Sequence, residues 1–149
     1  MEKPIGKLIK GRYVYTAHSG QTVFDVARSM SEKRVGALAV LEEDRLVGIF
    51  SERDLMTRVV AKGLNPQKVL VDEVMTRNLI VASPNDSYAE AMNKMQKASI
   101  RHLLIVDGPE LVGMLSLRDL MQVDIKEKSA EIESLNEYIH YSPPNIQNL

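Results

Sequence analysis

Residues 46–56, LVGIFSERDLM, decide the fold, because the same stretch recurs as residues 111–121, LVGMLSLRDLM. A shift of 65 residues aligns these stretches, and it extends the match without a gap from residues 9–60 to residues 74–125. Twelve of the 52 aligned positions are identical, and eight of the identities fall within the eleven-residue stretch. The chain therefore consists mainly of two similar copies, which we expect to bury their apolar faces against each other.

Each copy predicts the order strand, helix, strand, strand, helix. Residues 13–16 and 79–81 are short apolar runs typical of strands. Thr22 and Ser87 then stand three residues before an acidic side chain, which is the spacing of a capping box at the start of a helix. Two further apolar runs flank residues 42–45 in the first copy and 107–110 in the second, which predicts a hairpin before the last helix. Residues 63–66, GLNP, end that helix in the first copy.

The segment after the second copy predicts one amphipathic helix from about residue 120 to residue 138, ending before the Pro-Pro pair at 143–144. Its apolar residues follow a heptad spacing: Ile125, Ile132, Leu135 and Ile139. Two interpretations fit this narrow stripe, namely a helix folded back on its own domain and a contact with a second subunit.

Composition excludes several classes of protein. The chain has 149 residues, 44% of them hydrophobic, so it can build a core without disulfides or a structural metal. It contains no cysteine, which excludes a disulfide framework, a thiolate metal site and a cysteine nucleophile. A net charge of −1 and the lack of a long apolar run indicate no nucleic-acid partner, no membrane partner and no signal peptide. We therefore expect a cytoplasmic protein.

Catalytic motifs are missing from the sequence. The three histidines share no metal-ligand spacing, and the chain has neither a P-loop nor a G-x-G-x-x-G loop. No serine stands in a G-x-S-x-G elbow. We expect no enzymatic activity, no catalytic cofactor and no metal site.

A hydroxyl and a carboxylate stand three residues apart where a strand enters a helix in each copy, with an arginine between them: Ser51, Arg53 and Asp54, then Ser116, Arg118 and Asp119. Spacing alone favours a helix cap, in which the serine accepts from an early backbone N–H. A second interpretation is a nucleotide site. A carboxylate can accept hydrogen bonds from both ribose hydroxyls, and a helix N-terminus with serine and arginine can bind phosphate.

The runs VGALAVLEEDRLVGIFSERDLM (residues 35–56) and IRHLLIVDGPELVGMLSLRDLM (residues 100–121) resemble the second halves of two cystathionine-β-synthase (CBS) domains. Both carry the G-h-x-[ST]-x-x-D pattern of that family. The resemblance covers residues 9–125 and implies an α+β fold of two βαββα repeats related by pseudo-twofold symmetry, plus the C-terminal helix. We expect residues 1–68 and 69–125 to form the two CBS domains, and residues 126–149 the helix and tail.

The resemblance also implies two clefts between the repeats and the residues that line them. Asp54 and Asp119 would each hold a ribose, and Ser51 and Ser116 would approach the ribose or phosphate. The adenine would lie against the other copy: Val35, Gly36 and Ala37 for the cleft of Asp119, and Ile100, Arg101 and His102 for the cleft of Asp54. Backbone groups near Tyr15 and Ile80 would read the base edge, and Lys10 and Thr76 would add polar contacts.

The two copies differ where Gly36-Ala37 corresponds to Arg101-His102. The basic pair can contact phosphate, so we expect the clefts to differ in affinity or ligand preference. Simpler interpretations stand beside this one. Arg101 fits a surface cation lying over apolar neighbours, His102 fits a satisfied histidine at a strand start, and Arg53 and Arg118 fit salt bridges.

The leading hypothesis is a regulatory sensor that binds AMP, ADP, ATP, NAD or S-adenosylmethionine between its copies. The ligand would bias the conformation or assembly of the protein, which we expect to be a homodimer that acts on an unknown effector protein. The alternative is a ligand-independent dimerisation adaptor that acts through its C-terminal helix, with the serine and aspartate pairs serving only as helix caps.

Overall fold

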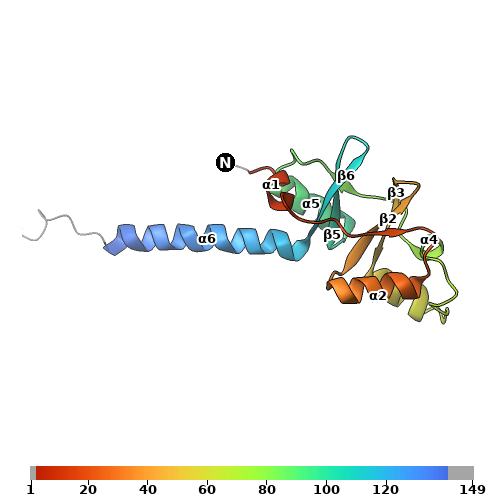
Figure 1. Ribbon diagram of the computed structural model, residues 1–149. Coiled ribbons are helices and arrows are strands. Elements are labelled where there is room, and N and C mark those ends of the chain that lie inside the picture. Colours follow the sequence, from red (N-terminus) through yellow and green to blue (C-terminus); the bar gives the residue numbers. More distant parts are fainter. Residues whose placement is uncertain (1–2, 141–149) are drawn as a thin grey trace, which may run out of the picture.

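The computed structural model describes residues 3–140 and contains two copies of one α+β unit (Figure 1). The first copy comprises β1 (Thr16–His18), α2 (Val23–Lys33), β2 (Ala37–Glu42), β3 (Arg45–Ser51), α3 (Glu52–Asp54) and the π-helical turn η1 (Leu55–Val60). The second comprises β4 (Val81–Ala82), α5 (Tyr88–Ala98), β5 (His102–Asp107), β6 (Glu110–Ser116) and α6 (Leu117–His140). Two short helices precede the copies, α1 (Gly6–Ile9) and α4 (Val71–Val74).

Each copy forms a three-stranded mixed sheet, in the order β1-β2-β3 and β4-β5-β6. The first strand of each sheet runs parallel to the second, and the last two strands form an antiparallel hairpin. The two hairpins have the same irregularity at equivalent positions, between Val40 and Leu41 and between Ile105 and Val106. The predicted α+β fold of two βαββα repeats is therefore confirmed.

The first strand of each copy lies later in the chain than predicted. Residues 13–16 and 79–81 were expected to be strands, whereas the parallel pairing involves residues 16–18 and 81–82. The apolar side chains just before these strands have another environment, because Tyr13, Tyr15, Leu79 and Ile80 line the clefts described below. An apolar pattern reports burial or partial burial, and it does not distinguish a sheet from the wall of a cleft.

The predicted helix caps are present. The Thr22 hydroxyl accepts a hydrogen bond from the backbone N–H of Asp25 at 3.2 Å and begins α2. At α5 the bond is reciprocal, because Ser87 accepts from the backbone N–H of Glu90 at 3.1 Å and the Glu90 carboxylate accepts from the backbone N–H of Ser87 at 2.8 Å. These bonds satisfy donors that the first turn of a helix leaves unpaired.

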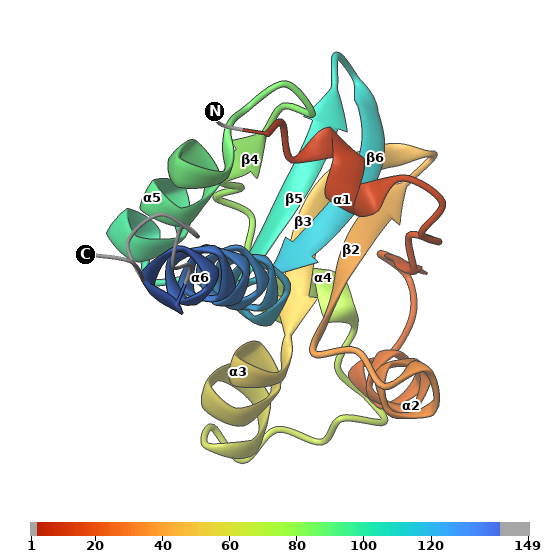
Figure 2. The ribbon, with the colours of Figure 1, turned by 90° about the vertical axis from the view of Figure 1, so that its left-hand side faces the viewer.

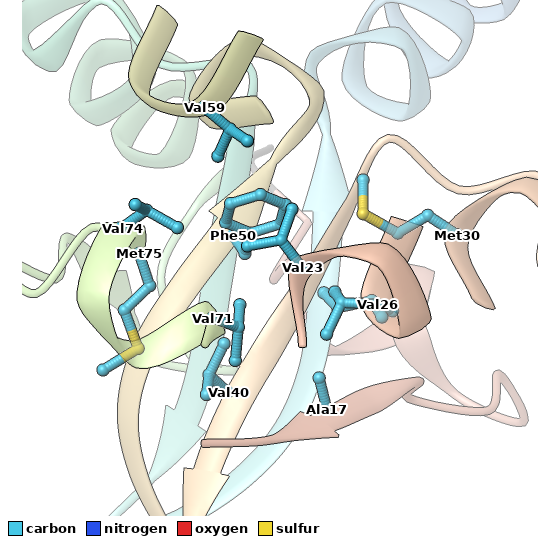
Figure 3. Packing of buried hydrophobic residues seen from close by; sticks show 11 residues of the cluster. Ala17, Val23, Val26, Met30, Val40, Phe50, Val59, Val71, Val74 and Met75 are labelled. Atoms are coloured by element: carbon cyan, nitrogen blue, oxygen red, sulfur yellow. The ribbon is translucent and has the colours of Figure 1, made fainter. Parts of the chain in front are cut away.

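Each of the two hydrophobic cores contains residues from the part of the chain that belongs to the other copy. Helix α1, at the start of the chain, packs on β6 and places Ile5 and Ile9 in the core of the second copy. Helix α4, which leads into the second copy, packs on β3 and places Val71 and Val74 in the core of the first (Figures 2 and 3). The copies thus exchange their leading segments, and each core is completed by residues that the repeat assigns to the other copy.

Helix α6 projects away from the two sheets (Figure 1). It confirms the predicted C-terminal helix and begins three residues earlier, at Leu117. The interpretation of a helix folded back on its own domain is wrong for the described residues, since Ile132 and Leu135 remain 58% and 60% exposed. The Pro-Pro pair at 143–144 lies outside the described residues.

Candidate functional site

Two clefts lie between the copies, and each contains one of the paired serine and aspartate elements. The Asp119 cleft has a volume of about 850 Å³ and takes Tyr15, Val35 and Gly36 from the first copy. The Asp54 cleft has a volume of about 740 Å³ and takes Ile80 and Ile100 from the second copy. Both volumes fall within the range of small-molecule sites. The structure therefore brings each aspartate to the segment of the other copy that the family resemblance implied would lie opposite it.

Asp54 is almost fully engaged by the protein. Its Oδ2 accepts from the backbone N–H and the hydroxyl of Ser51, at 3.0 and 3.1 Å. Its Oδ1 accepts from the Thr76 hydroxyl at 3.1 Å and lies 3.5 Å from Nε of Arg58. The side chain is only 10% exposed. Both oxygens of Asp54 are thus already paired, Oδ2 within the helix cap and Oδ1 with Thr76 and Arg58.

Asp119 occupies the equivalent position with a more accessible carboxylate. Its Oδ2 accepts from the backbone N–H of Ser116 at 2.8 Å and lies 3.2 Å from the Arg12 guanidinium. Within residues 3–140, this hydrogen bond and this ion pair both use Oδ2, and the side chain is 25% exposed. Burial raises the pKa of Asp119, but the Ser116 N–H and Arg12 lower it by more, so its pKa lies below the ordinary value. Asp119 is therefore ionised at neutral pH and has an oxygen available to a ligand.

A shared wall separates the two clefts. Glu52, Arg101 and His102 line both of them. A Cβ built at Gly36 would lie 3.1 Å from the His102 ring and 3.3 Å from Oε1 of Glu52, so a larger residue would crowd this wall. Burial lowers the pKa of His102, and Arg101 lowers it further against the opposing charges of Glu52 and Asp119. His102 is consequently neutral at pH 7 and does not add charge to the clefts.

The clefts differ in charge. Four arginines and two carboxylates line the Asp119 cleft: Arg12, Arg34, Arg101, Arg118, Glu52 and Asp119. Three arginines and two carboxylates line the Asp54 cleft, and one of those arginines, Arg58, also donates to the backbone carbonyl of Met75 at 2.9 Å. Arg53 donates to the backbone carbonyl of Ser99 at 3.1 Å and so links the copies. The Asp119 cleft has the larger excess of positive charge.

Two predicted residues lie outside the clefts, and three arginines were missed. Ala37 is fully buried within β2, where it pairs with Ser51, and Lys10 follows α1 without lining either cleft. Arg12, two residues after Lys10, lines the Asp119 cleft and makes the polar contact there. Arg12 corresponds to Arg77 in the second copy, and this shared arginine is a sequence feature that could have identified Arg12 as a site residue. Arg34 and Arg58, the other two missed residues, have no such repeat identity.

The described residues contain neither a cluster of three metal-ligating side chains nor a helix long and apolar enough to cross a membrane. The residues that line the clefts offer a carboxylate to hydroxyl groups, guanidinium groups to an anion, and apolar walls to a flat ring.

The CBS domain family matches this chain at residues 9–61 and 71–126. The chain is 38% identical over 119 residues to CBS domain-containing protein CBSCBSPB2 of Arabidopsis thaliana, covering 78% of this chain and 22% of that much longer protein. It is 37% identical over 117 residues to CBS domain-containing protein YhcV of Bacillus subtilis, covering 78% and 83% of the two chains. Among solved structures, it is similar to CBS domain protein PAE2072 from Pyrobaculum aerophilum complexed with AMP, with a TM-score of 0.72, 30% identity and coverage of 78% and 89%.

Proposed function

This chain belongs to the CBS domain family, and we propose that it is a regulatory sensor that binds an adenine nucleotide in the Asp119 cleft. Pairs of CBS domains are regulatory modules that often bind adenine nucleotides, and the Pyrobaculum aerophilum relative is complexed with AMP. We expect a cytoplasmic protein with no activity as an enzyme. Its signal would pass to an effector protein or to a second copy of the chain.

One observation supports the choice of cleft: among residues 3–140, Oδ1 of Asp119 has no hydrogen-bond or ion-pair partner, whereas both oxygens of Asp54 are paired. A ribose can use Oδ1 of Asp119 without breaking the Ser116 cap. A ribose at Asp54 would have to displace Thr76 or Arg58, which costs the hydrogen bonds they make.

The other groups of the Asp119 cleft suit the rest of a nucleotide. Tyr15 and Val35 offer apolar contact to a base, and Gly36 leaves room beside them. Arg101 and Arg118 stand on the same cleft, where their charge favours phosphate. A nucleotide held by residues of both copies would favour one angle between them, and that preference would be transmitted along α6, whose first turn contains Asp119.

Calorimetric titration of the full chain with AMP, ADP, ATP, NAD, S-adenosylmethionine and GMP tests the proposal. Asp119→Asn preserves the shape and the acceptor of the cap but removes the charge. We expect it to raise the Kd of the bound adenine ligand about 10- to 100-fold, because a hydrogen bond to a charged group contributes about 1.5–3 kcal/mol. Asp54→Asn is the matched control, and we expect it to change the Kd less than about 3-fold.

The adaptor function remains the second candidate, because the caps at Ser51 and Ser116 are complete without a ligand. Absence of binding by every adenine compound at millimolar concentration would reject the sensor and leave the adaptor. A larger loss from Asp54→Asn than from Asp119→Asn would move the site to the other cleft.

A further inference from the structure

The wall between the two clefts contains one arginine that both clefts can use. Arg101 lines the Asp119 cleft and the Asp54 cleft, together with Glu52 and His102. The residue is exposed, and within residues 3–140 its guanidinium has no hydrogen-bond or ion-pair partner. Arg101 is therefore available to an anion on either side of the wall.

The two copies do not supply a matching pair of cations at this wall. The repeat aligns Arg101 with Gly36, and the two residues occupy equivalent places in their copies. The backbone carbonyl of Gly36 accepts from the N–H of Glu52 at 2.9 Å, and the carbonyl of Arg101 accepts from the N–H of Leu117 at 2.7 Å. Glycine brings no side chain, and the His102 ring and the Glu52 carboxylate lie beside it. The two clefts therefore share one guanidinium where a symmetric pair would have two.

The Asp54 cleft depends on Arg101 more than the Asp119 cleft does. The other arginines of the Asp54 cleft are engaged, because Arg53 and Arg58 each donate to a backbone carbonyl, at 3.1 and 2.9 Å. In the Asp119 cleft, the side chains of Arg34 and Arg118 have no hydrogen-bond or ion-pair partner in the described part of the chain. An anion in the Asp119 cleft thus has three unengaged guanidinium groups around it, and an anion in the Asp54 cleft has only Arg101 among those residues.

One guanidinium does not serve two phosphates equally well. Its strongest contact places two parallel N–H groups against a single phosphate. A phosphate in the Asp119 cleft that holds Arg101 in this way leaves Glu52 on the wall of the Asp54 cleft, where its negative charge repels a second phosphate. An uncharged ligand does not need Arg101, so it can bind in either cleft without this penalty.

We propose that the two clefts compete for Arg101, so that a phosphate-bearing ligand in the Asp119 cleft weakens the binding of a second one in the Asp54 cleft. The coupling is about 10-fold and reciprocal, because linkage requires each ligand to change the affinity for the other by the same factor. This inference rests on the proposed nucleotide site and adds a limit on how many phosphate-bearing ligands one chain holds. The backbone bond from Leu117 to Arg101 ties the shared residue to the first turn of α6.

Tryptophan fluorescence can measure each cleft separately, because the chain has no tryptophan of its own. Tyr13→Trp places the reporter at an exposed residue that lines only the Asp119 cleft, and Asn78→Trp places it at an exposed residue that lines only the Asp54 cleft. AMP and adenosine are matched probes, since they differ only in the phosphate. Ala27→Phe together with Ser31→Phe fills the Asp119 cleft from α2 and changes no charge.

In the Asn78→Trp chain, we expect the two phenylalanine substitutions to lower the Kd of AMP about 10-fold, because the Asp54 cleft then has Arg101 to itself. The Kd of adenosine should change less than about 2-fold. Adding Arg101→Gln should remove the difference for AMP. The Tyr13→Trp chain checks that the phenylalanines exclude AMP from the Asp119 cleft, and circular dichroism checks that every variant is folded.

Arg101→Gln also gives a test that does not need the filled cleft. We expect it to raise the Kd of AMP at least about 10-fold at the Asn78→Trp reporter and less than about 3-fold at the Tyr13→Trp reporter, where Arg34 and Arg118 remain.

Equal losses at both reporters, an AMP Kd that filling the Asp119 cleft leaves unchanged, or no AMP binding in the Asp54 cleft of the filled chain at about 10 mM would overturn the proposal while leaving the sensor in place. No response of the Tyr13→Trp chain to AMP, ADP, ATP or NAD would reject the nucleotide site itself, and the shared-cation proposal with it.

Discussion

The substitution Gly113→Ala tests the packing of α1, at the start of the chain, on β6 of the second copy. Gly113 lies on β6, and a Cβ built there would stand 2.7–2.9 Å from Cβ, Cγ2 and Cδ1 of Ile9. Ile9 is branched at Cβ and only 8% exposed, so relief requires α1 itself to move. Gly48 is the equivalent residue on β3, but its Cβ would meet the Cγ, Sδ and Cε atoms of Met75, a flexible side chain that can adjust.

The two substitutions should therefore differ in their cost. Overpacking costs about 1–3 kcal/mol, and replacing glycine by alanine returns about 0.4–1 kcal/mol by restricting the unfolded chain. We expect Gly113→Ala to lower the free energy of unfolding by about 1–2 kcal/mol, and Gly48→Ala to change it by less than about 0.5 kcal/mol. Neither glycine has a positive φ, so backbone strain does not contribute to the difference.

Urea denaturation at pH 7 and one protein concentration measures both values, and a fixed concentration removes any effect of association. A double-mutant cycle that combines Gly113→Ala with Ile9→Ala isolates the contact between these two residues. We expect the double variant to lose at least about 1 kcal/mol less free energy of unfolding than the two single variants lose in sum. An equal or greater loss from Gly48→Ala, or simple additivity in the cycle, would refute the packing argument.

Two further predictions concern the clefts. Because burial lowers the pKa of His102 from 6.5, the unfolded chain binds more protons below that pH, and the free energy of unfolding should fall from pH 7 to pH 5. His102→Gln should flatten this fall in urea titrations at pH 7, 6 and 5, and an unchanged slope would contradict the assignment. Arg58→Ala should cost about 1–2 kcal/mol, since it removes the bond to Met75 and the partner of buried Asp54. Arg53→Ala removes one exposed bond to Ser99 and should cost less than about 1 kcal/mol, and equal losses would argue against a special role for Arg58.

Local patterns predicted most of the elements and the candidate site. The capping residues Thr22 and Ser87 begin helices as expected, and the heptad spacing from Ile125 to Ile139 lies on one continuous helix. The serine and aspartate pairs begin the helices that follow the hairpins, as their spacing predicts. These features depend on hydrogen bonds and periodicities that span a few residues, so a short stretch of sequence contains the information needed to predict them.

The carboxylates of Asp54 and Asp119 have different partners because of the tertiary structure. Asp54 and Asp119 stand in nearly the same local sequence, and both cap a helix. Thr76 reaches Asp54, while Arg12 reaches Asp119 from the chain that follows α1. These partners come from segments 22 and 107 residues away in the chain. No local sequence pattern predicts which residue will contact each aspartate.

The sequence by itself determined the two-copy architecture and the order of the elements, and its resemblance to CBS domains indicated most of the residues that face the clefts. The tertiary structure alone decided that Ile9 completes the second core, that Val71 completes the first, and that Arg12 lies beside Asp119 while Lys10 lines neither cleft. An apolar residue shows in the sequence that it needs burial, but burial stabilises almost equally against any well-packed partner. The choice between the two cores follows from the path of the chain around the pseudo-twofold arrangement, which exists only once both copies have folded together.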